Sequence, residues 1–308
     1  MLPTTISFQN VTKTFGTNHN PKYAVRTLSW QAASGEVTGL LGPNGAGKTT
    51  IIRLLLDLMR PDVGEVLIDG DLRLNQTAAF RQSVGYLPEE RALYKHHRII
   101  DTLCYLGMLK GMPSSEAKKK VVKLLTKMNL SEYAKKSVET LSKGMAQRVQ
   151  LASCIVHDPQ LIILDEPFSG LDPVNVRAVR ELILDAKSKG KMIILCTHMM
   201  AEVEALCDRI VLVHRGEKLL EGEIKKIQRE FARCDVMLDK DAQPENLSCV
   251  RSIHQTATHK CVVLLDGMTR YDLMKEMAEN RRAVRSFEDG AASLEDIFVS
   301  LTSGASVS

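Results

Sequence analysis

A glycine-rich segment, Gly42-Pro-Asn-Gly-Ala-Gly-Lys-Thr49, constrains the fold of this chain more than any other feature. It fits the pattern G-x-x-x-x-G-K-[ST] and follows an apolar run, Val37–Leu41, that predicts a short buried strand. The apolar stretch from Lys48 to about Met59 predicts a helix that is stopped by Pro61. A strand, a glycine loop and a helix in this order predict a phosphate-binding loop. The simpler alternative is a glycine turn that only joins the strand to the helix.

Each part of this loop has a physical role in the prediction. Its backbone N–H groups curl around the β-phosphate, Lys48 neutralises charge on the β- and γ-phosphates, and Thr49 offers a hydroxyl to Mg²⁺. The helix N-terminus adds a partial positive charge. The ligands predicted are therefore ATP and Mg²⁺. The predicted nucleotide-binding residues here are Gly42, Pro43, Asn44, Gly45, Ala46, Gly47, Lys48, Thr49 and Thr50.

Two carboxylates follow a later apolar run. The segment Leu161–Leu164 predicts a buried strand, and Asp165 and Glu166 come directly after it. Ligands of open α/β folds bind at the carboxyl ends of the strands, so we expect both acids beside the nucleotide. We predict that Asp165 holds Mg²⁺ and that Glu166 is the general base for the attacking water. The simpler alternative is a pair of acids at a helix start.

Other hydrophobic patterns indicate the rest of an α/β architecture. Continuous apolar runs at 192–196 and 210–213, separated by helical stretches, predict a parallel sheet covered on both faces. Alternation around Phe8 and again around Trp30 predicts an antiparallel sheet near the N-terminus. The apolar spacing over 114–130 predicts a helix with Ser114 or Ser115 as its N-cap.

The chain is long enough for two domains. Its 308 residues exceed what a single hydrophobic core usually serves, and the pattern changes after Gly222. We expect a large domain over 1–222 and a small α+β domain over 223–308. The small domain is predicted to hold short strands at 235–238 and 261–265, a helix at 269–280 and a final segment at 293–301, where Ser293 and Asp296 resemble a helix cap.

Composition excludes several classes of function. A net charge of +4, from 41 basic and 37 acidic residues, is too balanced for general nucleic-acid binding. The seven cysteines are scattered and odd in number, which favours neither a disulfide framework nor a zinc site. No apolar run reaches the length of a membrane span, and the N-terminus has no secretion signal. We expect a cytoplasmic chain.

The segment Leu141-Ser-Lys-Gly-Met145 resembles the signature motif of the ABC ATPases, which most often reads Leu-Ser-Gly-Gly-Gln. The resemblance covers about residues 5–222 and implies a P-loop NTPase fold with a mixed, mainly parallel core sheet, an antiparallel N-terminal sheet and a helical subdomain at about 89–158. It also implies that Ser142 and Gly144, at the start of a helix over 143–156, cap the γ-phosphate held by a second subunit. The expected partner is therefore a second ATPase subunit, in a homodimer.

Further family elements follow in order. The segment Ser169-Gly-Leu-Asp172 resembles the loop through which the two subunits sense each other, and His198 stands where the family has its switch histidine. The resemblance implies that His198 contacts the γ-phosphate and holds the attacking water, which makes Lys48, Glu166 and His198 the catalytic set. Phe15 is the candidate for stacking on adenine, with Tyr23 as the alternative.

The sequence also departs from the family pattern. After Gly85-Tyr-Leu-Pro88, most members have a glutamine that reaches Mg²⁺, whereas this chain has Glu89. We expect Glu89 to contribute to the metal site and to change its affinity for Mg²⁺. Lys143 and Met145 replace the usual glycine and glutamine of the signature, and we expect the Lys143 ammonium to face the partner's nucleotide.

Gly85-Tyr-Leu-Pro-Glu-Glu-Arg91, the Leu-Ser-Lys-Gly signature and the tail Ser293-Leu-Glu-Asp-Ile-Phe298 resemble an export-type subgroup that includes sodium-efflux ATPases. This resemblance implies transmembrane permease subunits as partners. The chain would contact them through the surface at 89–101, including Tyr94, His96 and His97, and would lie on the inner face of the cell membrane without spanning it. The alternatives are a soluble ABC ATPase acting on ribosomes or DNA, and a binding-only regulator without catalysis.

Overall fold

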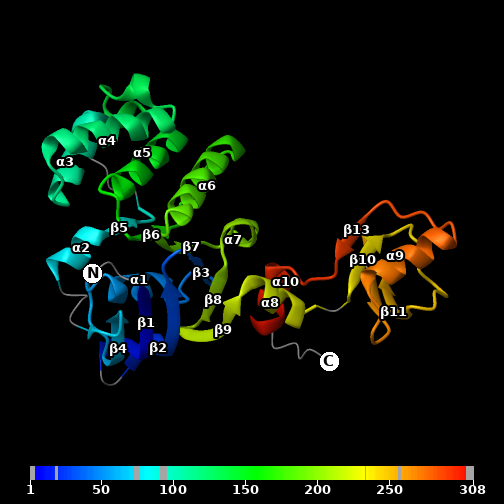
Figure 1. Ribbon diagram of the computed structural model, residues 1–308. Coiled ribbons are helices and arrows are strands. Elements are labelled where there is room, and N and C mark those ends of the chain that lie inside the picture. Colours follow the sequence, from blue (N-terminus) through cyan, green and yellow to red (C-terminus); the bar gives the residue numbers. More distant parts are fainter. Residues whose placement is uncertain are drawn as a thin grey trace. The chain divides into compact units, whose positions relative to one another are not determined.

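The computed structural model describes residues 4–17, 20–72, 77–90, 96–232, 234–255 and 258–302. The chain divides into two compact units, Met1–Gly222 and Glu223–Ser308, and each has its own hydrophobic core (Figure 1). Among the described residues, no helix combines the length and the apolar character needed to cross a bilayer.

A six-stranded sheet forms the centre of the first unit. Its strand order is β5-β6-β7-β3-β8-β9, and the neighbouring pairs β5–β6, β6–β7, β7–β3 and β3–β8 are parallel. The strands are β3 (Val37–Leu41), β5 (Val84–Leu87), β6 (Leu161–Asp165), β7 (Met192–Cys196), β8 (Arg209–His214) and β9 (Glu217–Glu223). The four continuous apolar runs became β3, β6, β7 and β8, which confirms the predicted parallel sheet.

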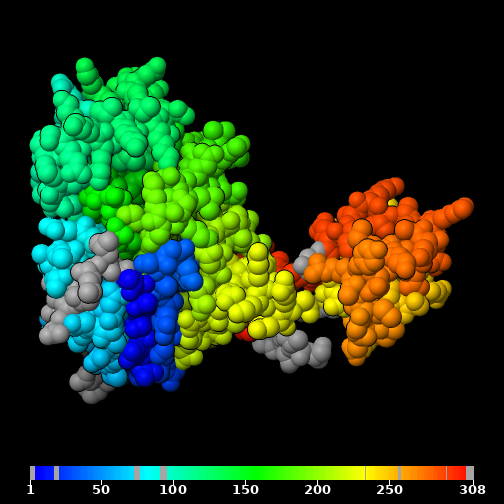
Figure 2. All heavy atoms as spheres, in the orientation of Figure 1, coloured from blue at the N-terminus to red at the C-terminus, as the bar shows by residue number. Residues whose placement is uncertain are grey.

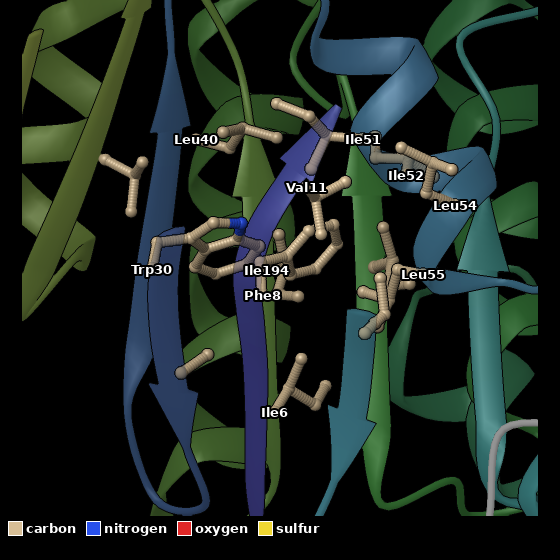
Figure 3. Packing of buried hydrophobic residues seen from close by; sticks show 14 of the residues in the cluster. Ile6, Phe8, Val11, Trp30, Leu40, Ile51, Ile52, Leu54, Leu55 and Ile194 are labelled. Carbon is tan, nitrogen blue, oxygen red and sulfur yellow. The ribbon is translucent and has the colours of Figure 1, made fainter. Parts of the chain in front are cut away.

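A second, antiparallel sheet has the order β2-β1-β4, from β1 (Thr5–Thr17), β2 (Asn20–Ala33) and β4 (Val63–Ile68). Phe8 and Trp30 are paired across β1 and β2, and their rings stack with centroids 5.0 Å apart. They join one core cluster with Ile51 of α1 and Leu40 of β3, so this core spans both sheets (Figure 3). Burial of these large apolar groups fixes the loop between β3 and α1 in place.

Helices complete the first unit. Three of them, α3, α4 and α5, form a subdomain at the opposite end of the unit from the antiparallel strands (Figures 1 and 2). The helices are α1 (Lys48–Leu55), α2 (Ala78–Ser83), α3 (Ile99–Leu109), α4 (Ser114–Lys127), α5 (Lys143–Ile155), α6 (Pro173–Ser188) and α7 (Met200–Leu206).

Two helix ends differ from the sequence prediction. Helix α1 ends at Leu55 and not near Met59, because Asp57 adopts φ 53° and Leu58 N–H bonds back to Arg53 O at 3.0 Å. A left-handed residue followed by such a bond closes a helix, usually with glycine. Helix α4 has Pro113 as its N-cap, so the expectation of Ser114 or Ser115 at that position was wrong. The Pro113 carbonyl accepts the first helical bonds.

The second unit is a small α+β structure. Its antiparallel sheet has the order β11-β12-β10-β13, and Leu273 and Met277 of α9 belong to the same core cluster as the β10 and β12 residues. Thr269 and Asp272 form a capping box at α9, and the Asp296 N–H donates to Ser293 Oγ at 3.1 Å, as the cap prediction required. The elements are α8 (Ile224–Glu230), β10 (Val236–Asp239), β11 (Val250–Gln255), β12 (His259–Leu264), α9 (Arg270–Glu279), β13 (Phe287–Asp289) and α10 (Leu294–Thr302).

Candidate functional site

The glycine-rich loop lies between β3 and α1 and is closely packed on two sides. Gly42 has φ 151°, and a Cβ there would lie 2.1 Å from the carbonyl oxygen of Val213 in β8. Gly47 has φ 108°, and a Cβ there would lie 2.2 Å from the Ala24 carbonyl oxygen in β2. Only glycine fits these backbone conformations and approaches. The tertiary structure therefore requires the two glycines that begin and end the loop.

Lys48 is buried at the first position of α1. Its Nζ donates to the carbonyl oxygens of Gly42 at 2.7 Å and Pro43 at 3.1 Å, so the ammonium lies within the loop. The first turn of α1 has no acidic side chain, and Thr49 is exposed beside it. A buried cation and a helix N-terminus without an acidic side chain are features that favour an anion at this loop.

Asp165 is the last residue of β6 and is buried. Burial raises the pKa of its carboxyl, and the nearby charges of Glu89 and Glu166 raise it further, while Lys48 opposes them. These effects indicate that charged residues from three separate segments of the chain lie within electrostatic reach of Asp165 or next to it. The structure thus brings together Lys48, Asp165, Glu166 and Glu89, as the sequence predicted for a single site.

Glu166 has an unusual backbone and a fully partnered carboxylate. Its φ is 48°, rare for a residue with a side chain, and its N–H donates to Cys196 O at the end of β7 at 2.8 Å. Thr197 Oγ1 donates to Oε2 at 3.1 Å, and the His198 N–H donates to Oε1 at 3.1 Å. The His198 ring nitrogen Nδ1 lies 2.8 Å from the same Oε1. Strained backbone of this kind gathers at functional sites.

The signature segment begins α5. Ser142 is exposed, and its Oγ accepts the Met145 N–H at 3.3 Å as the N-cap of this helix. Gly144 is buried, and a Cβ there would lie 2.5 Å from Nδ2 of Asn175 in α6. In this structure the serine is accessible at the surface, whereas the glycine is buried with the Asn175 side chain packed against it.

Lys143 does not extend freely away from the molecule. Its side chain packs against Gly170. A Cβ built on Gly170 would lie 1.9 Å from the Lys143 Nζ, and Gly170 has φ 65°. Asp172 ends this loop as the N-cap of α6, accepting the Asn175 N–H at 2.9 Å and its Nδ2 at 2.5 Å. These bonds lower the pKa of Asp172. The signature and the 169–172 loop are therefore in direct contact within one chain.

The two aromatic candidates for base stacking both lie on the β1–β2 pair. Phe15 is 44% exposed and Tyr23 is 49% exposed, with Lys13 over the Phe15 ring and Arg26 over the Tyr23 ring. Tyr23 precedes Ala24 in the chain, and the Ala24 carbonyl oxygen lies 2.2 Å from the position of a Cβ on Gly47. Both residues remain candidates.

Two buried glutamines of α5 connect the helical subdomain to the site. Gln147 Nε2 donates to Pro167 O at 3.1 Å, directly after Glu166, and Gln150 Nε2 donates to Glu90 O at 3.2 Å. The sequence prediction missed both glutamines, as well as Thr197 and Asn175. A polar pair three residues apart on the inner face of a predicted helix was the available signal for the glutamines.

The surface at 89–101 is only partly described. Tyr94, one of its predicted contact residues, lies outside the described residues. His96 Nδ1 lies 3.0 Å from Glu139, and the His97 carbonyl accepts the Val138 N–H at 3.4 Å. The expected permease-facing surface is thus joined to the segment that leads into the signature.

The donor set fits Mg²⁺. Asp165 and Glu89 supply carboxylates close enough to influence each other, and Thr49 supplies an exposed hydroxyl. Within the described part of the chain, no three His, Cys, Asp or Glu side chains converge as a metal cage. Nucleotide sites need none, because Mg²⁺ takes one or two carboxylates and completes its shell with phosphates and water.

Known proteins give the context for this geometry. The family model described as ABC transporter matches residues 25–169. An ABC transporter ATP-binding protein of Bacillus subtilis, YhaQ, is 37% identical, with 96% of this chain and 97% of that protein aligned. The Nod factor export ATP-binding protein I of Rhizobium sp. (strain N33) is 35% identical over 96% of each chain. A solved dimeric ATP-binding cassette in a post-hydrolysis state, bound to ADP and Pi, superposes with a TM-score of 0.64 at 25% identity, covering 71% of this chain and 98% of that one.

Proposed function

Because this chain belongs to the family of ABC transporter ATP-binding proteins, which bind ATP with Mg²⁺ and hydrolyse it, we propose that it drives export through a separate membrane permease. Export is supported by the relative named for Nod factor export, which aligns over nearly the whole of both chains. The chain would then act at the inner face of the cell membrane, held there by the permease.

The observation that carries the catalytic assignment is the environment of Glu166. Three donors from Thr197 and His198 fix its carboxylate at the end of β6, next to Asp165. In the proposed mechanism Glu166 accepts a proton from the water that attacks the γ-phosphate, and His198 orients that water. Lys48 leaves the loop carbonyls and neutralises phosphate charge.

The metal has a supporting role in this proposal. When bound, Mg²⁺ would neutralise negative charge that develops on the transferred phosphoryl group. Thr49, Asp165 and Glu89 are the residues proposed to hold it. The protein contributes the rest by positioning, because the loop backbone and the fixed Glu166 carboxylate are in place before the reaction.

Each nucleotide is proposed to lie between two copies of the chain. The loop at 42–50 of one subunit would hold ATP, and Ser142 and Gly144 of the other would complete the γ-phosphate site. The dimeric form of the superposed cassette supports this arrangement. In the single chain the Asn175 amide packs against Gly144, on the side where a Cβ would stand.

Closure then supplies the mechanical step. ATP contacts both subunits only in the closed dimer, so its binding energy favours that state, and hydrolysis removes the preference. The proposed transmitting surface is 89–101, because the Gln150 side chain ties Glu90 to the signature helix.

Comparing the ATPase activities of the wild type and Glu166→Gln tests the catalytic assignment. Loss of a general base costs about 10²–10⁴ in rate, so turnover should fall at least about 100-fold while ATP still binds. Glu132→Gln makes the same acid-to-amide change at an exposed position and should keep wild-type activity. Equal rates for Glu166→Gln and wild type would remove Glu166 from the mechanism.

Transport is tested separately, by co-purifying the chain with its membrane partner. Reconstituted vesicles with the ATPase on their outer face should accumulate substrate only with ATP and Mg²⁺, which corresponds to export from a cell. ATP-dependent efflux from such vesicles would contradict the proposed direction.

A further inference from the structure

Helices α6 and α7 are joined by a two-point ion pair. Arg180 Nε donates to Glu202 Oε2 at 2.5 Å, and Nη2 donates to Oε1 at 2.6 Å. The Glu202 side chain is 5% exposed, while Arg180 is 39% exposed. Two parallel bonds fix the orientation as well as the distance of the groups. Removal of the arginine would leave a buried carboxylate without its cation, which is strongly unfavourable.

On the α7 side, this pair holds the segment that positions Glu166. The N–H of Glu202 donates to Met199 O at 3.0 Å, and the N–H of Met199 donates to Thr197 Oγ1 at 3.2 Å. Thr197 Oγ1 in turn donates to Glu166 Oε2 at 3.1 Å. A displacement of α7 would therefore move the donors that fix the Glu166 carboxylate.

On the α6 side, the pair is tied to the loop expected to face the second subunit. Helix α6 starts at its cap, Asp172, the last residue of the 169–172 loop. Arg180 follows about two turns later on the same continuous helix. Asn175, in the first turn, also packs against Gly144 of the signature. The helix is thus a rigid connection between the intersubunit elements and Arg180.

We propose that Arg180 and Glu202 are positioning residues for ATP hydrolysis. Their ion pair holds α7 so that Thr197 and His198 keep Glu166 in its reactive place, and it passes movement of the 169–172 loop to that carboxylate. Neither residue touches the nucleotide. The inference rests on the proposed role of Glu166 as general base.

A matched pair of variants separates positioning from simple stabilisation. Arg180→Gln leaves the buried Glu202 without its cation. Asp158→Asn is the matched control, because it leaves a buried cation, Lys191, without its anion. The Lys191 side chain is 8% exposed, the Asp158 side chain is 61% exposed, and their charged atoms lie 2.9 Å apart. Thermal melting, kcat and KM for ATP are measured for both full-length variants, with rates corrected for the folded fraction.

Both variants should melt at a lower temperature than wild type. Only Arg180→Gln should lose turnover, by about tenfold or more, with its KM for ATP within about twofold of wild type, because the phosphate loop is untouched. Arg180→Lys keeps the charge but not the two-point geometry, so its kcat should lie between wild type and Arg180→Gln. Should Arg180→Gln fail to fold, Arg180→Lys measures the same contrast against Asp158→Asn.

A wild-type kcat in the arginine variants, or an equal loss of kcat in Asp158→Asn, would overturn the inference. The Glu166→Gln variant is assayed in parallel. Normal turnover in Glu166→Gln would overturn the proposed role of Glu166 as general base, whereas an inactive Glu166→Gln beside a fully active Arg180→Gln would overturn the positioning role alone.

Discussion

Two nitrogen atoms of His198 contact the same carboxylate oxygen of Glu166. The His198 backbone N–H lies 3.1 Å from Oε1 and the ring Nδ1 lies 2.8 Å from it, while Thr197 binds the other oxygen, Oε2. The carboxylate therefore cannot rotate without breaking bonds at both of its oxygens. The imidazole, fixed through Nδ1, presents Nε2 as its remaining polar atom.

His198→Ala should lower kcat by about 100-fold or more, because the proposed orientation of the attacking water is lost. Affinity for ATP should change only a few-fold, since Lys48 and the loop backbone are unaltered. Steady-state ATPase assays and binding of a fluorescent ATP analogue measure the two effects. The exposed His254, changed to Ala, serves as the control. Wild-type turnover in His198→Ala would exclude this histidine from the reaction.

Gly42→Ala and Gly45→Ala should differ sharply although both change a glycine of the same loop. At Gly42 a Cβ meets backbone atoms of β8 at 2.1 Å, whereas at Gly45, φ 81°, nothing lies within 4 Å. We expect a loss of more than about 2 kcal/mol in the free energy of unfolding for Gly42→Ala, with loss of ATP binding. Gly45→Ala should lose about 1 kcal/mol from backbone strain alone. Urea unfolding compares them, and equal losses would be inconsistent with this packing.

Glu89→Gln should raise the Mg²⁺ concentration needed for half-maximal ATPase activity. Burial is the main cause of the raised pKa of Asp165, and the Glu89 charge adds to it, so Glu89 strengthens the negative field at the metal site. Removing that charge should cost about 1 kcal/mol of attraction, or roughly fivefold in Mg²⁺ affinity. Glu90→Gln changes the adjacent acid and should have no such effect. Identical Mg²⁺ titrations for wild type and Glu89→Gln would show that Glu89 does not contribute.

His157 should make the first unit less stable as the pH falls. Burial, helped by Lys110, lowers the pKa of His157 to about 4, and its Nε2 lies 3.1 Å from Val84 O. Among the described residues its buried Nδ1 has no hydrogen-bond partner, and burial disfavours the charged form of the ring. Between pH 6.5 and 4 the unfolded chain gains a proton that the folded chain does not. Stability is therefore full above about pH 6.5 and falls by at most roughly 3 kcal/mol towards pH 4.

Fluorescence of the single tryptophan, Trp30, reports urea unfolding of this unit. His157→Gln keeps a donor for Val84 O but does not titrate, so its stability should depend less on pH in this range. If both proteins show the same dependence, His157 is not the group responsible.

Sequence patterns predicted the parts of the fold that depend on local chemistry. Continuous apolar runs identified β3, β6, β7 and β8, because strands buried on both faces need no polar residues. The four-residue strand β5, which contains Gly85 and Tyr86, was too short and too mixed to stand out. The end of α1 was misplaced because Asp57, and not a glycine, adopts the left-handed conformation.

For the same reason, sequence patterns predicted some residues of the candidate site and missed others. Lys48, Asp165 and Glu166 lie in short motifs with a local mechanism, and the structure brings them together. Contacts between distant side chains leave no such local pattern. Asn175 over Gly144, and Lys143 across Gly170, depend on the packing of α5 against α6. The expectation that Lys143 faces the partner's nucleotide therefore stays a prediction. In the single chain, the Lys143 ammonium lies against Gly170.

The central claim is that a nucleotide bound at 42–50 is completed by Ser142 of a second subunit. Analytical ultracentrifugation of Glu166→Gln with ATP and Mg²⁺ tests it most directly, because this variant should bind ATP without consuming it. The account predicts a dimer with ATP and a monomer without. Adding Ser142→Asp, which keeps the helix cap but repels phosphate, should abolish the dimer. ATP-driven dimerisation that is unaffected by Ser142→Asp, or absent in Glu166→Gln, would contradict the account.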